Sequence, residues 1–250
     1  MITVIIATHN AQDSIQKTID SLKFQSSKNF ELIVVDGASK DDTMKIVKSN
    51  GSFITKSVSE PDNGLYEAWN KGIGLSSGEW ICFLGAGDTL FPEAFNEYEK
   101  VMEGHGCYYD YISAKINRMD HSDHVLSVLG KPWVWNEFKK TMTVAHVGSL
   151  HNRRLFDEVG LFDAKGYKIC ADYEFLLRKG DKLKAGFMND IIGNMSAGGI
   201  SFSSMALREY AQARKMTGHQ PIFDVYLNYF IQYILLKTYS IRKYILNFER

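Results

Sequence analysis

The chain has 250 residues, of which 45% are apolar and 23% are charged, and its formal net charge is zero. This composition is that of a globular protein, and the length suits one core domain with an appendage. The balanced charge gives no global field that would favour nucleic acid, so any electrostatic specificity must be local.

The first ninety residues alternate between buried strands and amphipathic helices. Short apolar runs predict strands over 2–7, 31–36, 52–58 and 79–84, and apolar side chains at helical spacing predict helices over 13–25, 41–49 and 64–75. Strands without polar alternation, separated by helices, predict a mainly parallel sheet with helices on both faces. Ligands of such sheets bind outside the carboxyl ends of the strands.

The pattern changes after residue 90. We expect helices over 92–102, 152–159 and 173–178, and strands over 108–115, 124–129, 144–150 and 184–189. These shorter strands indicate a mixed or antiparallel extension of the sheet. Trp133 and Trp135 fall in an expected loop, where core packing and stacking on an acceptor sugar both stay open. A turn-prone loop around Gly198 and Gly199 precedes two expected terminal helices, over 203–217 and 222–247.

Cysteine usage and hydropathy bear on the compartment. The three cysteines show no CxxC spacing, so we expect neither a zinc site nor a disulfide framework, and a reducing cytoplasm suits them. No signal-peptide pattern precedes the first strand, and no run of 18 apolar residues predicts a membrane-spanning helix.

Polar clusters follow three of the predicted strands. They read Thr8-His9-Asn10, Asp36-Gly-Ala-Ser39 and Gly85-Ala-Gly-Asp88. A carboxylate beyond a buried strand can bind a ribose, a base edge or a cation, and the neighbouring glycines let a ligand approach the backbone. Each aspartate alone could equally be a turn or cap residue. Three such clusters on one parallel sheet favour a binding crevice.

Six segments resemble the family 2 glycosyltransferases, which have the GT-A fold: TVIIATHN, ELIVVDGASKDDT, EPDNGLYEAWNKGI, GEWICFLGAGD, HVGSLHNRRLFDEVGLFD and KICADYEFLLR. They occur in the family's order over residues 1–200. The resemblance implies that Asp36 contacts the nucleotide base, usually uracil. It also implies that the loop of Thr8, His9 and Asn10 lines the nucleotide.

The resemblance assigns the other site residues as well. The part that closes over the ribose and diphosphate corresponds to Asp62, Asn63, Gly64, Asn70 and Lys71. Gly87 and Asp88 match the end of the family's DXD motif, whose last acid holds Mn²⁺ or Mg²⁺ on the diphosphate. Hard oxygen ligands suit both ions. Ala86 stands where the first acid would be, which leaves metal dependence open.

Asp172 matches the acid of the family's ED motif, the general base that takes a proton from the attacking hydroxyl. Ala171 stands in place of the preceding acid, and Asp172 could also cap a helix over 173–178. His146 occupies a position where family members often carry a histidine facing the acceptor or the diphosphate, although a structural role stays open. The pair Arg153-Arg154 is expected to be solvated.

The sequence therefore predicts an inverting glycosyltransferase that moves a sugar from a nucleotide-sugar donor, with UDP expected, to a glycan or lipid-linked glycan hydroxyl in polysaccharide biosynthesis. Residues 1–200 would form the GT-A domain, with a nucleotide-binding half over 1–90 and an acceptor-binding half over 91–200. The alternative is a non-catalytic nucleotide-binding or membrane-docking subunit. A nucleotidyltransferase would need a basic, glycine-rich loop that Thr8-His9-Asn10-Ala11 does not provide.

Residues 201–250 form an expected helical extension. The stretch from Phe223 to Leu236 is crowded with apolar and tyrosine residues, and Lys237, Arg242, Lys243 and Arg250 follow. This pattern suits a helix lying at the inner face of the cell membrane. Packing on the domain, or on a second copy in a homodimer, stays open.

Overall fold

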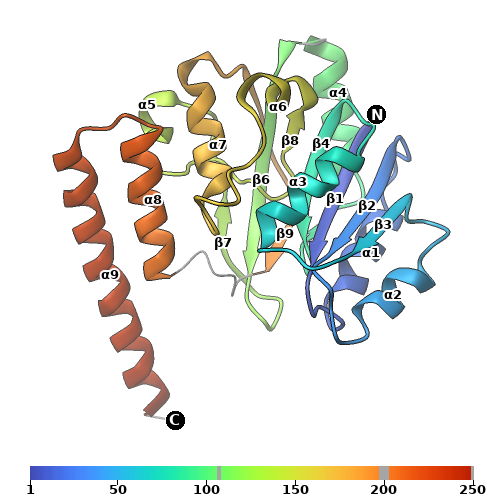
Figure 1. Ribbon diagram of the computed structural model, residues 1–250, viewed down its shortest axis with the longest axis horizontal. Coiled ribbons are helices and arrows are strands. Elements are labelled where there is room, and N and C mark those ends of the chain that lie inside the picture. Colours follow the sequence, from blue (N-terminus) through green and yellow to red (C-terminus); the bar gives the residue numbers. More distant parts are fainter. Residues whose placement is uncertain (106–107, 197–202, 249–250) are drawn as a thin grey trace.

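The computed structural model describes residues 1–105, 108–196 and 203–248. Figure 1 shows a twisted central sheet with helices on both faces and two C-terminal helices at one end. The strands are β1 (Ile2–Thr8), β2 (Phe30–Asp36), β3 (Lys56–Ser59), β4 (Trp80–Gly85), β5 (Thr89–Leu90), β6 (Tyr111–Met119), β7 (Val125–Leu129), β8 (Leu150–Asn152) and β9 (Ala185–Ser196). The helices are α1 (Ile15–Lys23), α2 (Thr43–Ser49), α3 (Leu65–Leu75), α4 (Ala94–His105), α5 (Trp135–Phe138), α6 (Arg153–Val159), α7 (Ala171–Lys179), α8 (Ser204–Met216) and α9 (Ile222–Phe248).

The strands of the described residues are ordered β3-β2-β1-β4-β8-β6-β9-β5, with β7 paired to β6. The first four strands of this order are parallel, whereas β8 runs antiparallel to both β4 and β6. The continuous apolar runs explain the parallel half, because its strands are buried on both faces. This mixed, mainly parallel sheet confirms the predicted fold class.

Two hydrophobic clusters lie on opposite faces of the sheet. Helices α1, α2 and α4 cover one face, where Ile19, Val47 and Phe95 pack against alternate residues of β1 and β2. Helices α3, α6 and α7 cover the other face, where Trp69 and Phe175 belong to the second cluster. Alternate strand residues point to opposite faces, so a single apolar strand supplies both clusters.

Several boundaries differ from the sequence prediction. The strand expected over 144–150 was wrong: Gly148 has φ 76°, in the left-handed region that interrupts a strand, and β8 begins only at Leu150. The strand expected over 52–58 begins later, at Lys56, because backbone hydrogen bonds to Asn50 form a turn before it. Both terminal helices were predicted correctly, and the Gly198-Gly199 loop lies outside the described residues.

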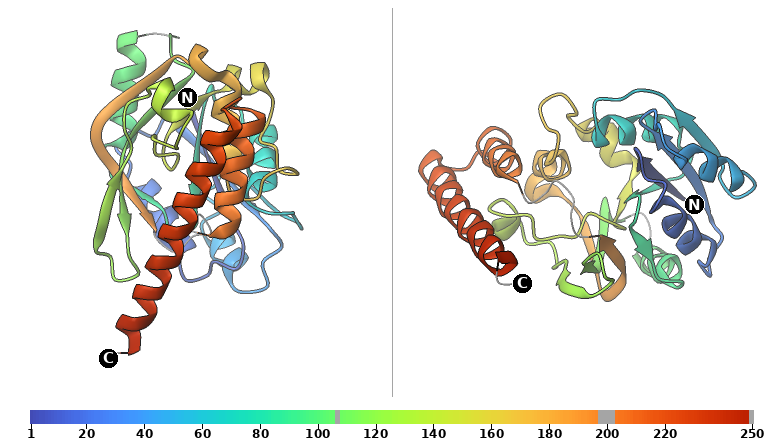
Figure 2. Two further views of the ribbon diagram at one scale, coloured as in Figure 1. Left: turned by 90° about the vertical axis from the view of Figure 1, so that its left-hand side faces the viewer. Right: turned by 90° about the horizontal axis from the view of Figure 1, so that it is seen from below.

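The C-terminal helices stand apart from the sheet. Helix α9 packs along α8, and its far end extends beyond the rest of the molecule on the side where β1 ends (Figures 1 and 2). Among the described residues, none of the helices combines the length and apolar character needed to cross a membrane.

Candidate active site

The polar clusters that follow β1, β2 and β4 lie at the carboxyl ends of the parallel strands. In the sheet register, Thr8 pairs with Asp36, Ala7 pairs with Gly85, and Asp36 pairs with Ser59. The ends of β1, β2, β3 and β4 therefore lie at one edge. This edge is where a parallel sheet binds its ligands.

The Asp36 carboxylate is fully buried and held by three donors. Its Oδ1 accepts a hydrogen bond from the Ser39 hydroxyl at 2.5 Å, and its Oδ2 accepts from the Ser39 amide at 3.0 Å and from the Ser59 hydroxyl at 2.6 Å. A carboxylate offers about four acceptor positions, so capacity for one further donor remains. The sequence analysis assigned no role to Ser59, which joins the site through the pairing of β3 with β2.

The loops after β1 and β2 interlock. The Asn10 amide donates to the Ser39 hydroxyl at 2.7 Å, and the Lys40 amide donates to Asn10 Oδ1 at 2.8 Å. His9 Nδ1 lies 2.8 Å from the Gly37 carbonyl oxygen, which can only accept, so Nδ1 carries the proton. These bonds fix the loop at the positive φ of 47° that Asn10 adopts.

Thr8 brings an unpaired polar atom to this edge. Its hydroxyl is buried, and no described residue hydrogen-bonds to it. Burying a hydroxyl without a partner costs free energy. A ligand in the crevice could supply the missing partner.

The segment after β3 folds onto the β2 loop. A Cβ atom at Gly37 would lie 2.9 Å from Asp62 Oδ2, so only glycine permits this approach. Asp62 Oδ1 accepts from the Gly64 amide at 2.9 Å, and the Asn63 side chain donates to Glu67 at 2.8 Å. Asp62 is therefore brought beside the loop after β2, whereas the Asn63 side chain is engaged within its own segment.

The other two residues of this stretch have protein partners. Lys71 Nζ lies 3.1 Å from a Glu60 carboxylate oxygen and donates to the Pro61 carbonyl at 3.0 Å. The Asn70 amide group bonds the backbone N–H and C=O of Phe162, at 3.1 and 2.8 Å. Asn70 thus ties α3 to the loop after α6.

Asp88 is 7% exposed, and both of its oxygens accept backbone hydrogen bonds. The Gly85 amide donates to Oδ2 at 2.9 Å, and the Ser196 amide donates to Oδ1 at 3.1 Å. Burial raises the pKa of Asp88 to about 6, although the two amides act in the opposite direction. Gly87 has φ 105°, a backbone conformation that favours glycine.

The donor set around Asp88 limits how a divalent cation could bind. Ala86 supplies no carboxylate, and no group of three His, Cys, Asp or Glu side chains suited to a metal occurs among the described residues. One hard, buried oxygen ligand fits Mg²⁺ or Mn²⁺ only if phosphate and water supply most of the coordination.

Asp172 is half-buried in the first turn of α7, whose N-cap residue is Cys170, so Asp172 is not the N-cap residue, although it bonds an amide of the first turn. Its Oδ1 lies 2.9 Å from the Tyr66 hydroxyl and accepts from the Tyr173 amide at 2.9 Å. Oδ2 has no hydrogen-bond partner within the described part of the chain. Burial, and then the charge of Asp172, raise the pKa of Tyr66 well above its ordinary value, so this hydroxyl stays protonated. No local sequence pattern pointed to this pair, whose members are 106 positions apart.

His146 lies beside this carboxylate in an aromatic box. Its ring stacks on Trp69 with a centroid distance of 5.1 Å and on Phe83 at 5.6 Å. Burial lowers the pKa of His146, and the negative charge of Asp172 offsets this only in part. The imidazole is therefore uncharged near neutral pH, and its buried Nε2 has no partner among the described residues.

The expectation that Arg153 and Arg154 are solvated was wrong. Arg153 donates to the Gly78 carbonyl and the Ser76 hydroxyl, and Arg154 forms an ion pair with buried Asp110 at 2.9 Å. The two arginines fasten the start of α6 to the sheet.

The tryptophan pair packs beside the core. Trp133 and Trp135 stack on each other at 6.3 Å, and Trp133 contacts Phe138 at 4.2 Å. Both are partly buried against the cluster on the α7 face. Packing accounts for their positions.

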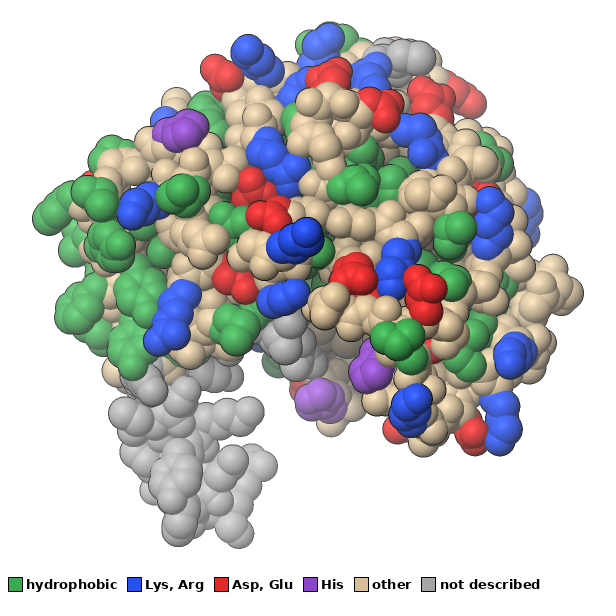
Figure 3. Space-filling view, viewed as in Figure 1, with side chains coloured by type: hydrophobic (Ala, Val, Ile, Leu, Met, Phe, Trp, Pro, Cys, Tyr) green, Lys and Arg blue, Asp and Glu red, His purple; other side chains and the backbone are tan. Residues whose placement is uncertain are grey.

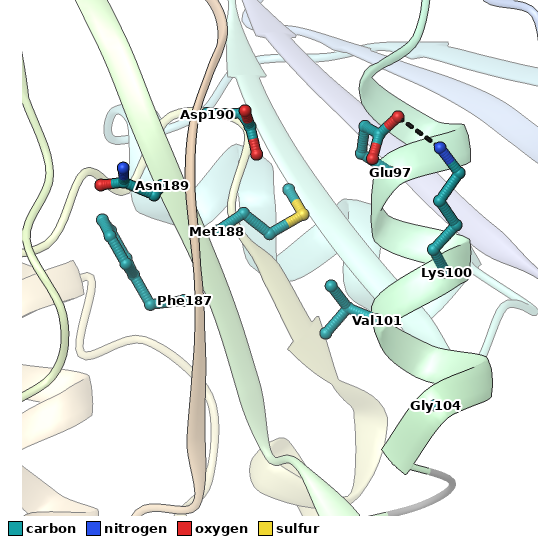
Figure 4. A pocket seen from close by; sticks show the side chains of 8 residues that line it. All are labelled: Glu97, Lys100, Val101, Gly104, Phe187, Met188, Asn189 and Asp190. Carbon is teal, nitrogen blue, oxygen red and sulfur yellow. Dashed lines mark hydrogen bonds and ion pairs between the residues drawn. The ribbon is translucent and has the colours of Figure 1, made fainter.

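A separate groove of about 400 Å³ runs between α4 and β9 (Figure 4). Its lining includes Lys100, Phe187 and Asp190. Asp190 and Ser196 are six residues apart on β9, which corresponds to about 20 Å along an extended strand. This groove is therefore remote from Asp88, which contacts Ser196.

Comparison with known proteins identifies the family. The sequence profile described as "Glycosyl transferase family 2" matches residues 3–159, more than half of the chain. The chain belongs to the family 2 glycosyltransferases. It is thus a transferase, and the predicted family membership is confirmed.

Relatives and solved structures agree with this assignment. A "PGL/p-HBAD biosynthesis glycosyltransferase" of Mycobacterium bovis is 26% identical over 190 residues, covering 71% of this chain and 69% of that protein. An uncharacterized glycosyltransferase of Mycobacterium tuberculosis is 29% identical over 180 residues, covering 71% and 68%.

Two solved structures share the GT-A fold. TarS 1–349 of S. aureus, solved with UDP, has a TM-score of 0.67 at 18% identity, covering 85% of this chain and 64% of that one. This chain therefore spans just under two thirds of that TarS fragment. The mannosyltransferase PcManGT of Pyrobaculum calidifontis, solved with GDP-Man and Mn²⁺, has a TM-score of 0.66 at 16% identity, covering 88% and 64%.

Proposed function

We propose that this glycosyltransferase is an inverting enzyme that transfers a hexose or N-acetylhexosamine from a UDP-sugar to a sugar hydroxyl. The observation that carries the proposal is the environment of Asp172. One oxygen is fixed by Tyr66 and the Tyr173 amide, while the other is open at a half-buried position. A carboxylate held in this way can take the proton of an attacking hydroxyl in a defined direction.

In the proposed reaction, the acceptor oxygen attacks the anomeric carbon and loses its proton to Asp172 Oδ2. The bond from the anomeric carbon to the diphosphate breaks, and the nucleoside diphosphate leaves with the bonding electron pair. A direct displacement of this kind inverts the anomeric centre. Tyr66 is a positioning residue, because its hydroxyl bonds Oδ1 and leaves Oδ2 of Asp172 to take the proton.

We assign the donor to the edge formed by β1, β2 and β4. The remaining acceptor position of Asp36 suits the N–H of a uracil base, and the unpaired Thr8 hydroxyl suits a polar group of the nucleotide. Asn10 and His9 shape this loop, and Asp62 and Gly64 lie against it at Gly37. TarS has also been solved with UDP-GlcNAc and PcManGT with GDP-Man, so the choice of uridine here rests on Asp36 and on the family resemblance rather than on these structures.

We assign a divalent cation, Mn²⁺ or Mg²⁺, to Asp88 together with the donor diphosphate and water. The cation would neutralise charge on the departing diphosphate. Within this chain, Gly87 provides the turn that brings Asp88 to the Gly85 amide, and Ser196 fixes its second oxygen. Because Asp88 is a single protein carboxylate, we expect weak binding of the cation in the absence of nucleotide.

We also propose that residues 1–200 act as the GT-A domain, with the donor half over 1–90 and the acceptor half over 91–200, and that 201–250 form an extension. The two site carboxylates Asp88 and Asp172 fall in different halves of this division. The acceptor would be a glycan, either free or linked to a lipid. The enzyme would act in polysaccharide biosynthesis in the cytoplasm.

The test is transfer by Asp172→Asn with UDP-sugars and a panel of glycan acceptors. We expect kcat to fall at least about a thousandfold, while UDP binding stays unchanged, because only the proton acceptor is lost. Asp181→Asn is the matched control, since this exposed aspartate follows α7 at its other end. Transfer by Asp172→Asn close to wild type would remove Asp172 from the mechanism. UDP binding without turnover by the wild type on any donor would instead favour the non-catalytic subunit.

A further inference from the structure

Helix α9 exposes a continuous row of large apolar side chains. We name it the α9 apolar face, and its members are Ile222, Phe223, Tyr226, Leu227, Phe230, Ile231, Ile234 and Leu235, each 45–73% exposed. In the space-filling view, apolar side chains gather at the end of the molecule where the C-terminal helices lie (Figure 3). Exposed apolar patches of this kind mark interaction sites rather than ordinary surface.

The α9 apolar face is too broad for one partner helix. Each residue advances about 100° around a helix, so these eight side chains cover an arc of about 220°. Val225, which is 1% exposed, lies outside this arc on the side that packs against the protein. A helix seated against a core presents an apolar stripe of about 100°, and a helix that is apolar nearly all round is immersed in an apolar environment.

The charges of α9 identify that environment. Helix α9 contains one acidic residue, Asp224 in its first turn, and three basic residues, Lys237, Arg242 and Lys243. A helix with a large apolar face and a net positive charge is complementary to a lipid surface with anionic headgroups. Its tyrosines, such as Tyr226, combine an apolar ring with a polar hydroxyl that suits the headgroup level.

The position of α9 leaves it accessible to a flat surface. Helix α9 lies at the outer end of the molecule, on the far side of α8 from the sheet, and its C-terminal end projects past the domain (Figures 1 and 2). A planar bilayer can therefore approach the α9 apolar face without contact with β1–β4.

We propose that α9 docks the protein peripherally on an anionic lipid bilayer, with the α9 apolar face inserted at the level of the headgroups and upper acyl chains. The docking goes beyond the transfer reaction and does not depend on the assignment of its base. It would hold the transferase beside acceptors that are themselves attached to lipid.

The test is co-sedimentation of the full chain with vesicles of equal parts phosphatidylglycerol and phosphatidylcholine, and with vesicles of phosphatidylcholine alone. We expect binding to the anionic vesicles that weakens as salt is raised from 0.05 to 0.5 M. The double variant Phe223→Asp/Phe230→Asp should lower the partition coefficient by about thirtyfold per site, because each phenylalanine leaves the lipid.

Phe24→Asp is the matched control. Phe24 is 74% exposed at the end of α1, compared with 73% for Phe223, so the control changes an equally exposed phenylalanine away from α9. Vesicle binding of Phe24→Asp should equal that of the wild type, and transfer to a water-soluble acceptor should be equal in all three proteins. This activity assay separates loss of docking from failure of the proposed reaction.

Three results would overturn the proposal. One is the absence of binding to anionic vesicles, and another is equal binding by the wild type and the double variant. The third is a solution mass of twice 28.4 kDa that reverts to the monomer in the double variant, because the α9 apolar face would then be an interface with a second copy.

Discussion

Replacing Asp88 by asparagine should change how stability depends on pH. Burial raises the pKa of Asp88 from 3.8 to about 6. Between these values the folded protein retains a proton that the unfolded chain has lost, so this group makes stability fall as pH rises from 4 to 6. The shift in pKa corresponds to about 3 kcal/mol of unfolding free energy, and the protein has lost this whole amount above pH 7.

The assay is urea unfolding of the wild type and of Asp88→Asn, followed by tryptophan fluorescence from pH 4 to pH 7.5. The asparagine amide cannot accept from both Gly85 and Ser196, which adds a cost of about 1–3 kcal/mol that is the same at every pH. The unfolding free energy of the variant relative to that of the wild type should therefore rise by about 3 kcal/mol from pH 4 to pH 7.5. Asp157→Asn, at an exposed position of α6, should change it by less than about 0.5 kcal/mol.

The same proton links stability to the ligand. In the proposed cation site a proton and a divalent cation would compete for Asp88, so UDP with Mn²⁺ should stabilise the wild type more at pH 7.5 than at pH 5. The variant should show no such difference. Two results would refute the reasoning on this buried carboxylate. One is a difference in unfolding free energy between wild type and variant that stays constant with pH. The other is a stabilisation by UDP and Mn²⁺ that does not depend on pH.

Two further substitutions test the contacts of α3. Tyr66→Phe should lower kcat about 10- to 100-fold with little change in the KM for the donor, because it removes a hydrogen bond to the Asp172 carboxylate. The control is Tyr98→Phe, which deletes a buried hydroxyl that has no partner in the described part of the chain. This control should leave kcat unchanged. Gly72→Ala should cost about 1–3 kcal/mol in urea unfolding, since its Cβ would lie 2.4 Å from Ile5, whereas Gly74→Ala meets no atom within 4 Å and should cost nothing. Equal effects within either pair would contradict these assignments.

The polar clusters at the ends of β1, β2 and β4 were predictable because their signals are local. Each parallel strand is a continuous apolar run that ends in a polar cluster, so the sequence alone placed Thr8, Asp36 and Asp88 near strand ends. Sheet register then brings the first two directly opposite each other. Parallel strands share one carboxyl edge, which converts three local patterns into one expected crevice.

The contacts of Arg154 and Asp172 were less predictable because they join distant residues. Arg154 was expected to be solvated, yet its partner Asp110 lies 44 positions away, immediately before β6. Tyr66 reaches Asp172 across 106 positions. Single-sequence patterns report the period of a helix or strand, but they do not report which side chains meet across elements.

Three aspartates of the proposed active site have the same chemistry and three different environments. Asp36 is buried and accepts from three donors, which leaves about one acceptor position for the base in the proposed donor complex. Asp88 is buried with only two backbone amides, so its pKa is raised and a cation beside it would relieve an unfavourable burial of charge. Asp172 keeps an oxygen without a protein partner at a half-buried position, where an acceptor hydroxyl can reach it. We infer that burial and donor count, rather than residue type, divide base recognition, cation binding and proton transfer among them.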